Sequence, residues 1–206
     1  MRNSRIIFLL LSSLVLYSCA DHKLASFEKK VDVTEKRVKS FIPADKAIKY
    51  KASIDVLNKH FTGLIVIKQT DTVTKHLVFL TELGMRMFDF EWKKDSMKPV
   101  FVFDALNKPK LITALIKNFE TIFLVKWGDK YAKSIYRGNQ NIVHLKEGKK
   151  DSYFISENEP NSTSVQWVFY KHRKEARVIY INDYNKIKLK QYGLVKFYIE
   201  LDKINE

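Results

Sequence analysis

The chain has 206 residues, of which 46% are hydrophobic and only six are glycine and four proline, which excludes a disordered or collagen-like chain. Lysine and arginine outnumber aspartate and glutamate by 37 to 23, giving a formal net charge of +14. Such an excess of basic residues is found in proteins that bind nucleic acid or anionic lipid head groups, but it also occurs where lysines simply lie on solvated strand faces and loops. Because the lysines are scattered in short clusters, we favour solvated faces and expect no nucleic-acid partner.

The N-terminus has the organisation of a secretory signal. Arg2 and Arg5 precede an apolar segment, residues 6–16, that is shorter than the roughly 20 residues needed to span a bilayer. Leu16-Tyr17-Ser18-Cys19 then resembles the lipobox of bacterial lipoproteins. We predict that residues 1–18 are removed and that Cys19 becomes a lipidated N-terminus carrying acyl chains such as palmitate. The alternative is an ordinary signal peptide with a chance cysteine.

Lipidation of Cys19 would place the protein on a membrane without a transmembrane helix, because several acyl chains together give stable anchoring. Cys19 is also the only cysteine, so neither a disulfide nor a cysteine nucleophile is expected. Ala20 rather than aspartate follows the cysteine, so the inner-membrane retention signal of enteric bacteria is absent. Asp21-His22-Lys23 is too weakly acidic to resemble a surface-export tag. We therefore predict a bacterial envelope lipoprotein on the outer membrane, facing the periplasm.

Beyond the cysteine, residues 19–45 are polar without a sustained period and are predicted to be a tether. Alternation then predicts strands at 50–57, 61–68, 73–81, 85–92 and 99–103 of a single domain, residues 46–206. The third and fourth strands meet at the tight Glu82-Leu83-Gly84 turn. In the fourth, the aromatic side chains share one face, and Met87, Asp89 and Glu91 share the other.

One helix is predicted at 108–123, where Leu111, Leu115, Phe119 and Ile122 recur at helical spacing behind Pro109. Strands resume at 132–136, 141–146, 152–155, 164–170, 177–181, 186–191 and 195–201. The hairpin-length connections indicate an antiparallel meander, and so large a sheet curls because twist accumulates between strands. The fold class is therefore α+β and mainly antiparallel β: a curled sheet or incomplete β-barrel of about eleven strands, with the helix covering its concave side.

Two stretches carry a family resemblance. FTGLIVIKQTDTVTKHLVFLTELGMRMFDFEW, residues 61–92, is similar to the opening strands of the LolA/LolB lipoprotein-carrier superfamily, and residues 185–204 resemble its closing hairpin. The predicted helix matches its lid helices, and the composition resembles that of uncharacterised Bacteroidetes-type lipoproteins. The resemblance implies a carrier or acceptor that holds acyl chains or lipoproteins in the concave side of the sheet.

The resemblance also implies a role for Leu83. Its position matches an apolar residue that protrudes from a turn of LolB-type proteins and helps deliver acylated cargo into the outer membrane. Glu82 stands where a proline often precedes that residue, which is a departure from the pattern. The alternatives are a leucine folded back onto its own sheet and a singly exposed leucine.

Catalytic patterns are missing from the sequence. The five histidines have no metal-ligand spacing, and there is neither a GxSxG motif nor a glycine-rich phosphate loop. Asp89 and Glu91 are interpreted as residues of a solvated exterior, and His76 and His144 as structural. We expect no enzymatic activity, no cofactor and no metal.

Aromatic residues on neighbouring strands and on the helix instead favour binding. The predicted apolar cavity comprises Phe88, Phe90, Trp92, Phe101, Phe103, Leu111, Leu115, Phe119, Ile122 and Phe123. The first hypothesis is a monomeric carrier or acceptor of acyl chains or lipoproteins. The alternative is a non-enzymatic structural or interaction lipoprotein whose interior is filled and which binds another envelope protein. Both need the same residue types, so both remain open at this point.

Overall fold

A computed structural model describes residues 33–37, 47–126, 131–137, 140–157, 163–182, 184–193 and 195–204. All of them belong to one compact unit, Val33–Glu206. The predicted signal peptide, Cys19 and most of the predicted tether lie outside the described residues.

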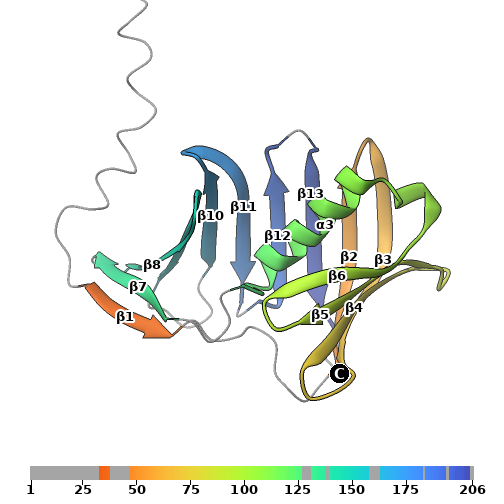
Figure 1. Cartoon of the computed structure of the whole chain (residues 1–206), viewed down its shortest axis with the longest axis horizontal. Helices are drawn as coiled ribbons and strands as arrows, with labels where there is room; N and C mark the ends of the chain where they lie inside the picture. Colours follow the sequence, from red (N-terminus) through yellow and green to blue (C-terminus); the bar gives the residue numbers. More distant parts are fainter. Residues whose placement is uncertain are drawn as a thin grey trace, which may run out of the picture. The chain divides into compact units, whose positions relative to one another are not determined.

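The described strands form one antiparallel sheet of thirteen strands. Their bounds are β1 Val33–Arg37, β2 Ile48–Val56, β3 Lys59–Gln69, β4 Thr74–Thr81, β5 Arg86–Lys93, β6 Ser96–Val102, β7 Tyr131–Arg137, β8 Gln140–Glu147, β9 Lys150–Glu157, β10 Ser164–Tyr170, β11 Arg173–Ile181, β12 Lys186–Gln191 and β13 Phe197–Lys203. The order across the sheet is β1-β7-β8-β9-β10-β11-β12-β13-β2-β3-β4-β5-β6, so β1 and β6 are its two edges and the sheet does not close (Figure 1).

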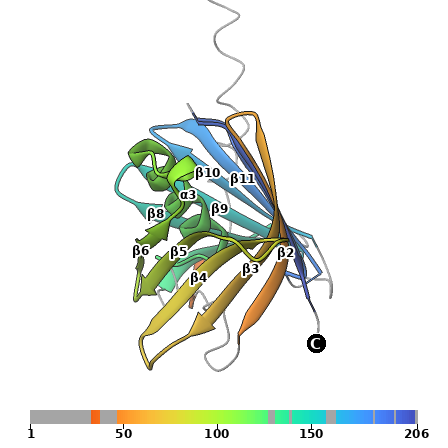
Figure 2. The same ribbon diagram turned by 90° about the vertical axis from the view of Figure 1, so that its right-hand side faces the viewer.

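Alternation of buried and less buried residues gives the sheet two different faces. In β2, every second residue from Ile48 to Val56 is buried, while the residues between them are partly or fully exposed. The strands fan around the helix when viewed along the sheet (Figure 2). We call the buried face, which carries the core, the inner face and the opposite one the outer face. The predicted fold class, a curled and unclosed antiparallel sheet with one helix, is confirmed.

The inner face is covered by α3 (Pro109–Ile122), which crosses in front of β12, β13 and β2 in Figure 1. A short 3-10 helix, η2 (Asp104–Leu106), leads into it from β6. Pro109 occupies the first turn, where its missing N–H has no intrahelical partner to lose. Leu111, Leu115 and Phe119 point into the core at helical spacing. None of the helices in the described residues is long and apolar enough to cross a bilayer.

The predicted tether contains a strand that sequence periodicity missed. β1 pairs with β7 from Val33↔Ile135 to Arg37↔Tyr131, so the compact unit begins at Val33 rather than near residue 46. Its sequence, VTEKR, has one apolar residue and therefore no visible alternation. An edge strand of this kind joins through backbone hydrogen bonds, which carry no side-chain signature.

Candidate functional site

Aromatic rings from β5 and α3 meet beneath the helix. Phe88 and Phe90 stack with ring centroids 4.7 Å apart, and Phe119 of α3 lies 5.6 Å from Phe88. Phe119 also stacks on Phe123 at 6.3 Å, and Trp92 stacks on Phe123 at 6.4 Å. All five side chains are buried. The rings therefore form a continuous cluster that joins the helix to the sheet.

The structure brings together most of the predicted cavity residues. Those in the main core cluster are Phe88, Phe90, Trp92, Leu111, Leu115, Phe119, Ile122 and Phe123, with Phe103 partly buried against it. They were predicted because apolar residues recur every second residue in the strand and every third or fourth residue in the helix.

Phe101 was predicted for the same cavity, and this is wrong. The register of β5 and β6 shifts between Asp89 and Phe90, because Phe90 pairs with Pro99 whereas Asp89 pairs with Phe101. A bulge inserts one residue and reverses the alternation beyond it. Phe101 therefore shares the outer face with Asp89, and the Arg86 guanidinium carbon lies 4.3 Å from its ring centroid.

The apolar interior is larger than the predicted set, because β2 and β11–β13 also contribute. Tyr50 of β2 lies 6.2 Å from Phe123, and Tyr180 of β11 packs in the same cluster. Burial raises the pKa of both phenols above their ordinary value of 10.0. The strict alternation of apolar and polar residues in these strands is the sequence pattern that could have placed their apolar residues in the predicted interior.

Polar contacts fasten α3 along both of its sides. On the β11–β12 side, the Tyr180 hydroxyl lies 3.0 Å from the Ile122 carbonyl oxygen, Asn118 donates to Gln191 at 2.8 Å, and Lys117 pairs with Glu175. On the β6 side, the Met97 amide donates to Glu120 at 3.1 Å. These contacts orient the helix, and the buried apolar area beneath it supplies most of the adhesion.

The inner face changes character toward β8–β10. Gln166, Ser152 and Asn141 are buried polar residues there, and Gln166 lies 2.9 Å from the Tyr180 hydroxyl. The apolar cluster at this end is small and consists of Leu124, Ala132 and Leu145, with Val143 packed against it. The aromatic surface suited to acyl chains is therefore bounded on this side by polar groups.

The β4–β5 turn projects an apolar side chain into solvent. Leu83 is 94% exposed. The turn is closed by hydrogen bonds from Gly84 to Thr81 and from Thr81 to Met85, and Gly84 has φ +78°. Glycine is favoured here because a Cβ is disfavoured at positive φ. The predicted alternative of a leucine folded back onto its sheet is wrong, while a role in membrane contact stays a prediction.

On the outer face, Asp89 is buried rather than solvated as predicted from the strand pattern. Only 7% of it is exposed, because it pairs with Phe101 and lies 2.7 Å from His76 Nδ1 and 3.6 Å from Arg86. The contact with Asp89 fixes the orientation of the His76 imidazole. Within the described residues, no group of three or more His, Cys, Asp or Glu side chains is placed to hold a metal ion.

Comparisons with known proteins give a distant likeness to a solved structure. No family model matches the chain, and no curated protein matches it either. Among solved structures, it is similar to a LolA superfamily protein from Nitrosomonas europaea, with 5% sequence identity, a TM-score of 0.34, and coverage of 80% of this chain and 86% of that one.

Proposed function

We propose that this protein is a lipoprotein of the bacterial outer membrane that binds acyl chains, free or attached to a lipoprotein, between α3 and the inner face of the sheet. It acts as a carrier or acceptor in envelope lipid or lipoprotein localisation and is not an enzyme. Cys19 anchors it, and the β4–β5 turn contacts the membrane.

One observation carries this proposal: an apolar path runs from solvent into the core. Leu83 is almost fully exposed, Met85 is 46% exposed, and Met87 and Phe88 are buried in the aromatic cluster. A register shift between Phe79 and Leu80 accommodates Met87 as an extra residue that packs into the core. A turn that presents apolar groups to a membrane is therefore continuous with an interior that suits acyl chains.

Binding requires α3 to move. The rings beneath it are in mutual contact and buried, so an acyl chain has to take the place of ring-to-ring contacts. The Lys117–Glu175 pair spans the helix and the sheet and is partly exposed, with 41% and 19% of the side chains accessible. A covalent cross-link between these two positions would therefore hold the helix against the sheet.

The test fastens the helix and measures uptake of a fluorescent fatty acid. Residues 20–206 contain no cysteine and every described element, so Lys117→Cys with Glu175→Cys supplies a unique pair for a short bis-maleimide. The matched control is Lys188→Cys with Glu200→Cys, which are directly paired on the outer face of β12 and β13. We expect cross-linking of the first pair to abolish uptake and cross-linking of the second to leave it unchanged.

Equal uptake by the cross-linked and free forms of the first pair would place the site elsewhere. No uptake by the unmodified chain, together with no lipid in a mass spectrum of its organic extract, would remove acyl binding altogether.

The contacts among the rings also favour a second candidate: a structural or interaction lipoprotein with a filled interior that binds another envelope protein. The two candidates differ in one measurement. The carrier takes up the fatty acid and the filled-core protein does not, although both have the same fold and the same anchor.

Leu83→Glu tests the membrane-contact turn. The side chain is exposed, so the change costs little stability. We expect weaker binding to liposomes and slower transfer of bound fatty acid to them. Unchanged binding and transfer would remove Leu83 from the proposal.

The lipid anchor has its own test: Cys19→Ser should abolish labelling of the protein by radioactive palmitate in cells.

A further inference from the structure

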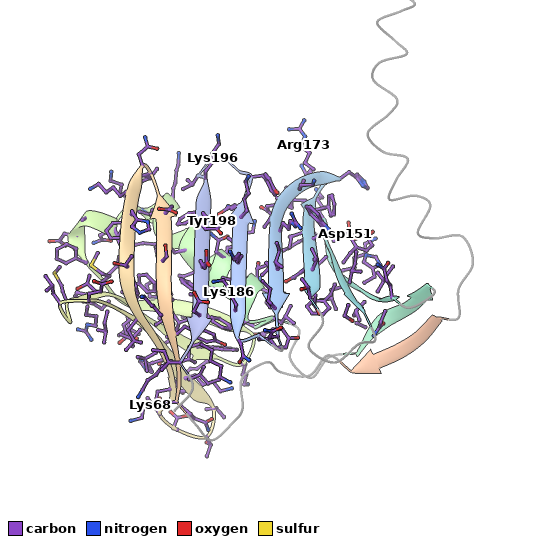
Figure 3. All side chains as sticks on the ribbon, turned by 180° about the vertical axis from the view of Figure 1, so that it is seen from behind. Lys68, Asp151, Arg173, Lys186, Lys196 and Tyr198 are labelled. Atoms are coloured by element: carbon purple, nitrogen blue, oxygen red, sulfur yellow. The ribbon has the colours of Figure 1, made fainter. Side chains whose placement is uncertain are left out.

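Five hairpin turns lie at one end of the sheet. They are β2–β3, β4–β5, β8–β9, β10–β11 and β12–β13, and the registers place them together: Tyr170 pairs with Lys150, Phe197 with Val56, and Gly63 with Thr81. Figure 3 shows Arg173 and Lys196 at this end and Lys68 at the other. Residues that are far apart in sequence therefore share one rim.

This rim is basic. Its exposed cations are Lys59, Lys149, Lys171, Arg173, Lys174, Lys190 and Lys196. Among the residues of this end whose side chains are described, Glu82 in the β4–β5 turn and Asp104 after β6 are exposed carboxylates. The half-exposed Asp55 and the less exposed Asp151 and Glu175 are paired with His60, His144 and Lys117. The sequence showed only scattered lysines, because the hairpins that gather them are separated along the chain.

The rim is also apolar and aromatic. Of the eight exposed large hydrophobic residues in the described part of the chain, five lie here: Leu57, Leu83, Met85, Tyr170 and Tyr192. Lysines lie over the tyrosine rings, with Lys171 5.8 Å from the centroid of Tyr170 and Lys174 and Lys190 each 5.7 Å from that of Tyr192. Tyrosine together with lysine is the combination that suits the interface between lipid head groups and acyl chains.

The opposite end of the strands differs. Exposed Lys68, Lys94 and Lys203 are there accompanied by exposed Asp71 and Asp95. Charges of both signs partly cancel over a Debye length, so this end presents a weaker field to an anionic surface.

We propose that the basic rim, the seven cations and five apolar residues named above, is a docking surface for an anionic phospholipid bilayer. This docking surface rests on the proposed function only because both include Leu83. It adds two things to that function: the class of lipid head group that is bound, and the orientation of the domain on the membrane. Each basic side chain near an anionic leaflet raises the binding constant about fivefold, and the apolar residues enter the interface between head groups. The strands stand end-on to the membrane, with the acyl path opening toward it.

Vesicle flotation of residues 20–206 tests the rim without the lipid anchor. Vesicles of phosphatidylcholine are compared with vesicles containing about one-third phosphatidylglycerol, over a range of salt concentrations. The rim variant is Lys171→Glu, Arg173→Glu and Lys196→Glu. The control variant, with the same charge change at the opposite end, is Lys68→Glu, Lys94→Glu and Lys203→Glu, and all six side chains are exposed.

We expect the unmodified chain to bind the anionic vesicles at least about tenfold more tightly than the neutral ones, and salt to weaken that binding. The rim variant should lose at least about tenfold in binding constant, and the control variant less than about threefold. Equal losses in the two variants would show a response to net charge alone and overturn the proposal. Equally tight binding to a short DNA duplex would identify a general polyanion surface and overturn it too.

The outcome is independent of cargo binding. A chain that floats with anionic vesicles but takes up no fatty acid keeps the docking surface and loses the proposed carrier function. A chain that takes up fatty acid but ignores the vesicles keeps the function and loses the docking surface.

Discussion

The two faces of the sheet are built from the same strands and hold the fold together differently. On β12 and β13 the inner residues Ile187, Leu189, Ile199 and Leu201 are fully buried under α3. On the outer face of these strands, Lys186 lies 2.7 Å from Glu200 and 2.9 Å from Asp202, and the Tyr198 hydroxyl lies 3.1 Å from Glu200 (Figure 3). Burial of apolar area stabilises one face, and partly exposed ion pairs lie on the other.

This difference determines where a substitution lowers the free energy of unfolding most. A buried ring loses its transfer free energy and leaves a cavity, whereas an exposed ion pair is screened by water and holds two flexible side chains in place. The outer face is not uniform, however. Around Asp89 it has a buried carboxyl group that pairs with His76 and Arg86, which combines the features of both faces.

The largest expected effect is at the inner face. Phe119→Ala should lower the free energy of unfolding by about 3–5 kcal/mol, because Phe119 is fully buried and contacts rings from β5. Urea unfolding followed by tryptophan fluorescence measures it. Thr113→Ala, on the exposed side of the same helix, is the control and should change it by less than about 0.5 kcal/mol. Similar values for the two variants would show that α3 does not pack on the sheet as described.

An intermediate effect is expected at the buried outer-face pair. Asp89→Ala should cost about 1–3 kcal/mol, because it leaves the part-buried His76 without its hydrogen-bond partner and removes the ion pair with Arg86. Asp55→Ala is the matched control: Asp55 pairs with His60 on the same face at 2.6 Å, but the two side chains are 49% and 58% exposed. The control should cost less than about 1 kcal/mol. Equal costs in urea unfolding would mean that burial does not distinguish the two histidine–aspartate pairs.

These residues also show what the sequence could and could not predict. Period-two alternation predicted β2–β5 and β10–β12 to within a few residues, because each strand has one face in water and one in the core. The position of Phe101 could not be predicted, since a bulge reverses the alternation and leaves no residue pattern of its own. The burial of Asp89 depends on that same bulge. The basic rim depends on strand pairing, which places hairpins together that are distant in sequence.

The smallest expected effect concerns the exposed ion pairs, and it depends on pH. The hydrogen bonds that Lys186 donates to Glu200 and Asp202 raise the pKa of Lys186, and the bond to Glu200 lowers the pKa of that glutamate below its ordinary 4.5. The raised lysine pKa contributes stability that is lost only in strong alkali. The lowered glutamate pKa contributes stability that is present above pH 4.5 and lost as the pH falls through the folded-state pKa.

Lys186→Met should therefore lower the free energy of unfolding by less than about 1 kcal/mol at pH 7, since Lys188 remains 3.2 Å from Glu200. That cost should begin to fall below pH 4.5 and approach zero as the pH falls through the lowered pKa of Glu200, because the protonated carboxyl group no longer attracts the ammonium group. Urea unfolding at several pH values measures both parts. A cost that stays constant down to acid pH would have to come from lost packing of the lysine stem, and the outer face would then resemble the inner one more than its charges indicate.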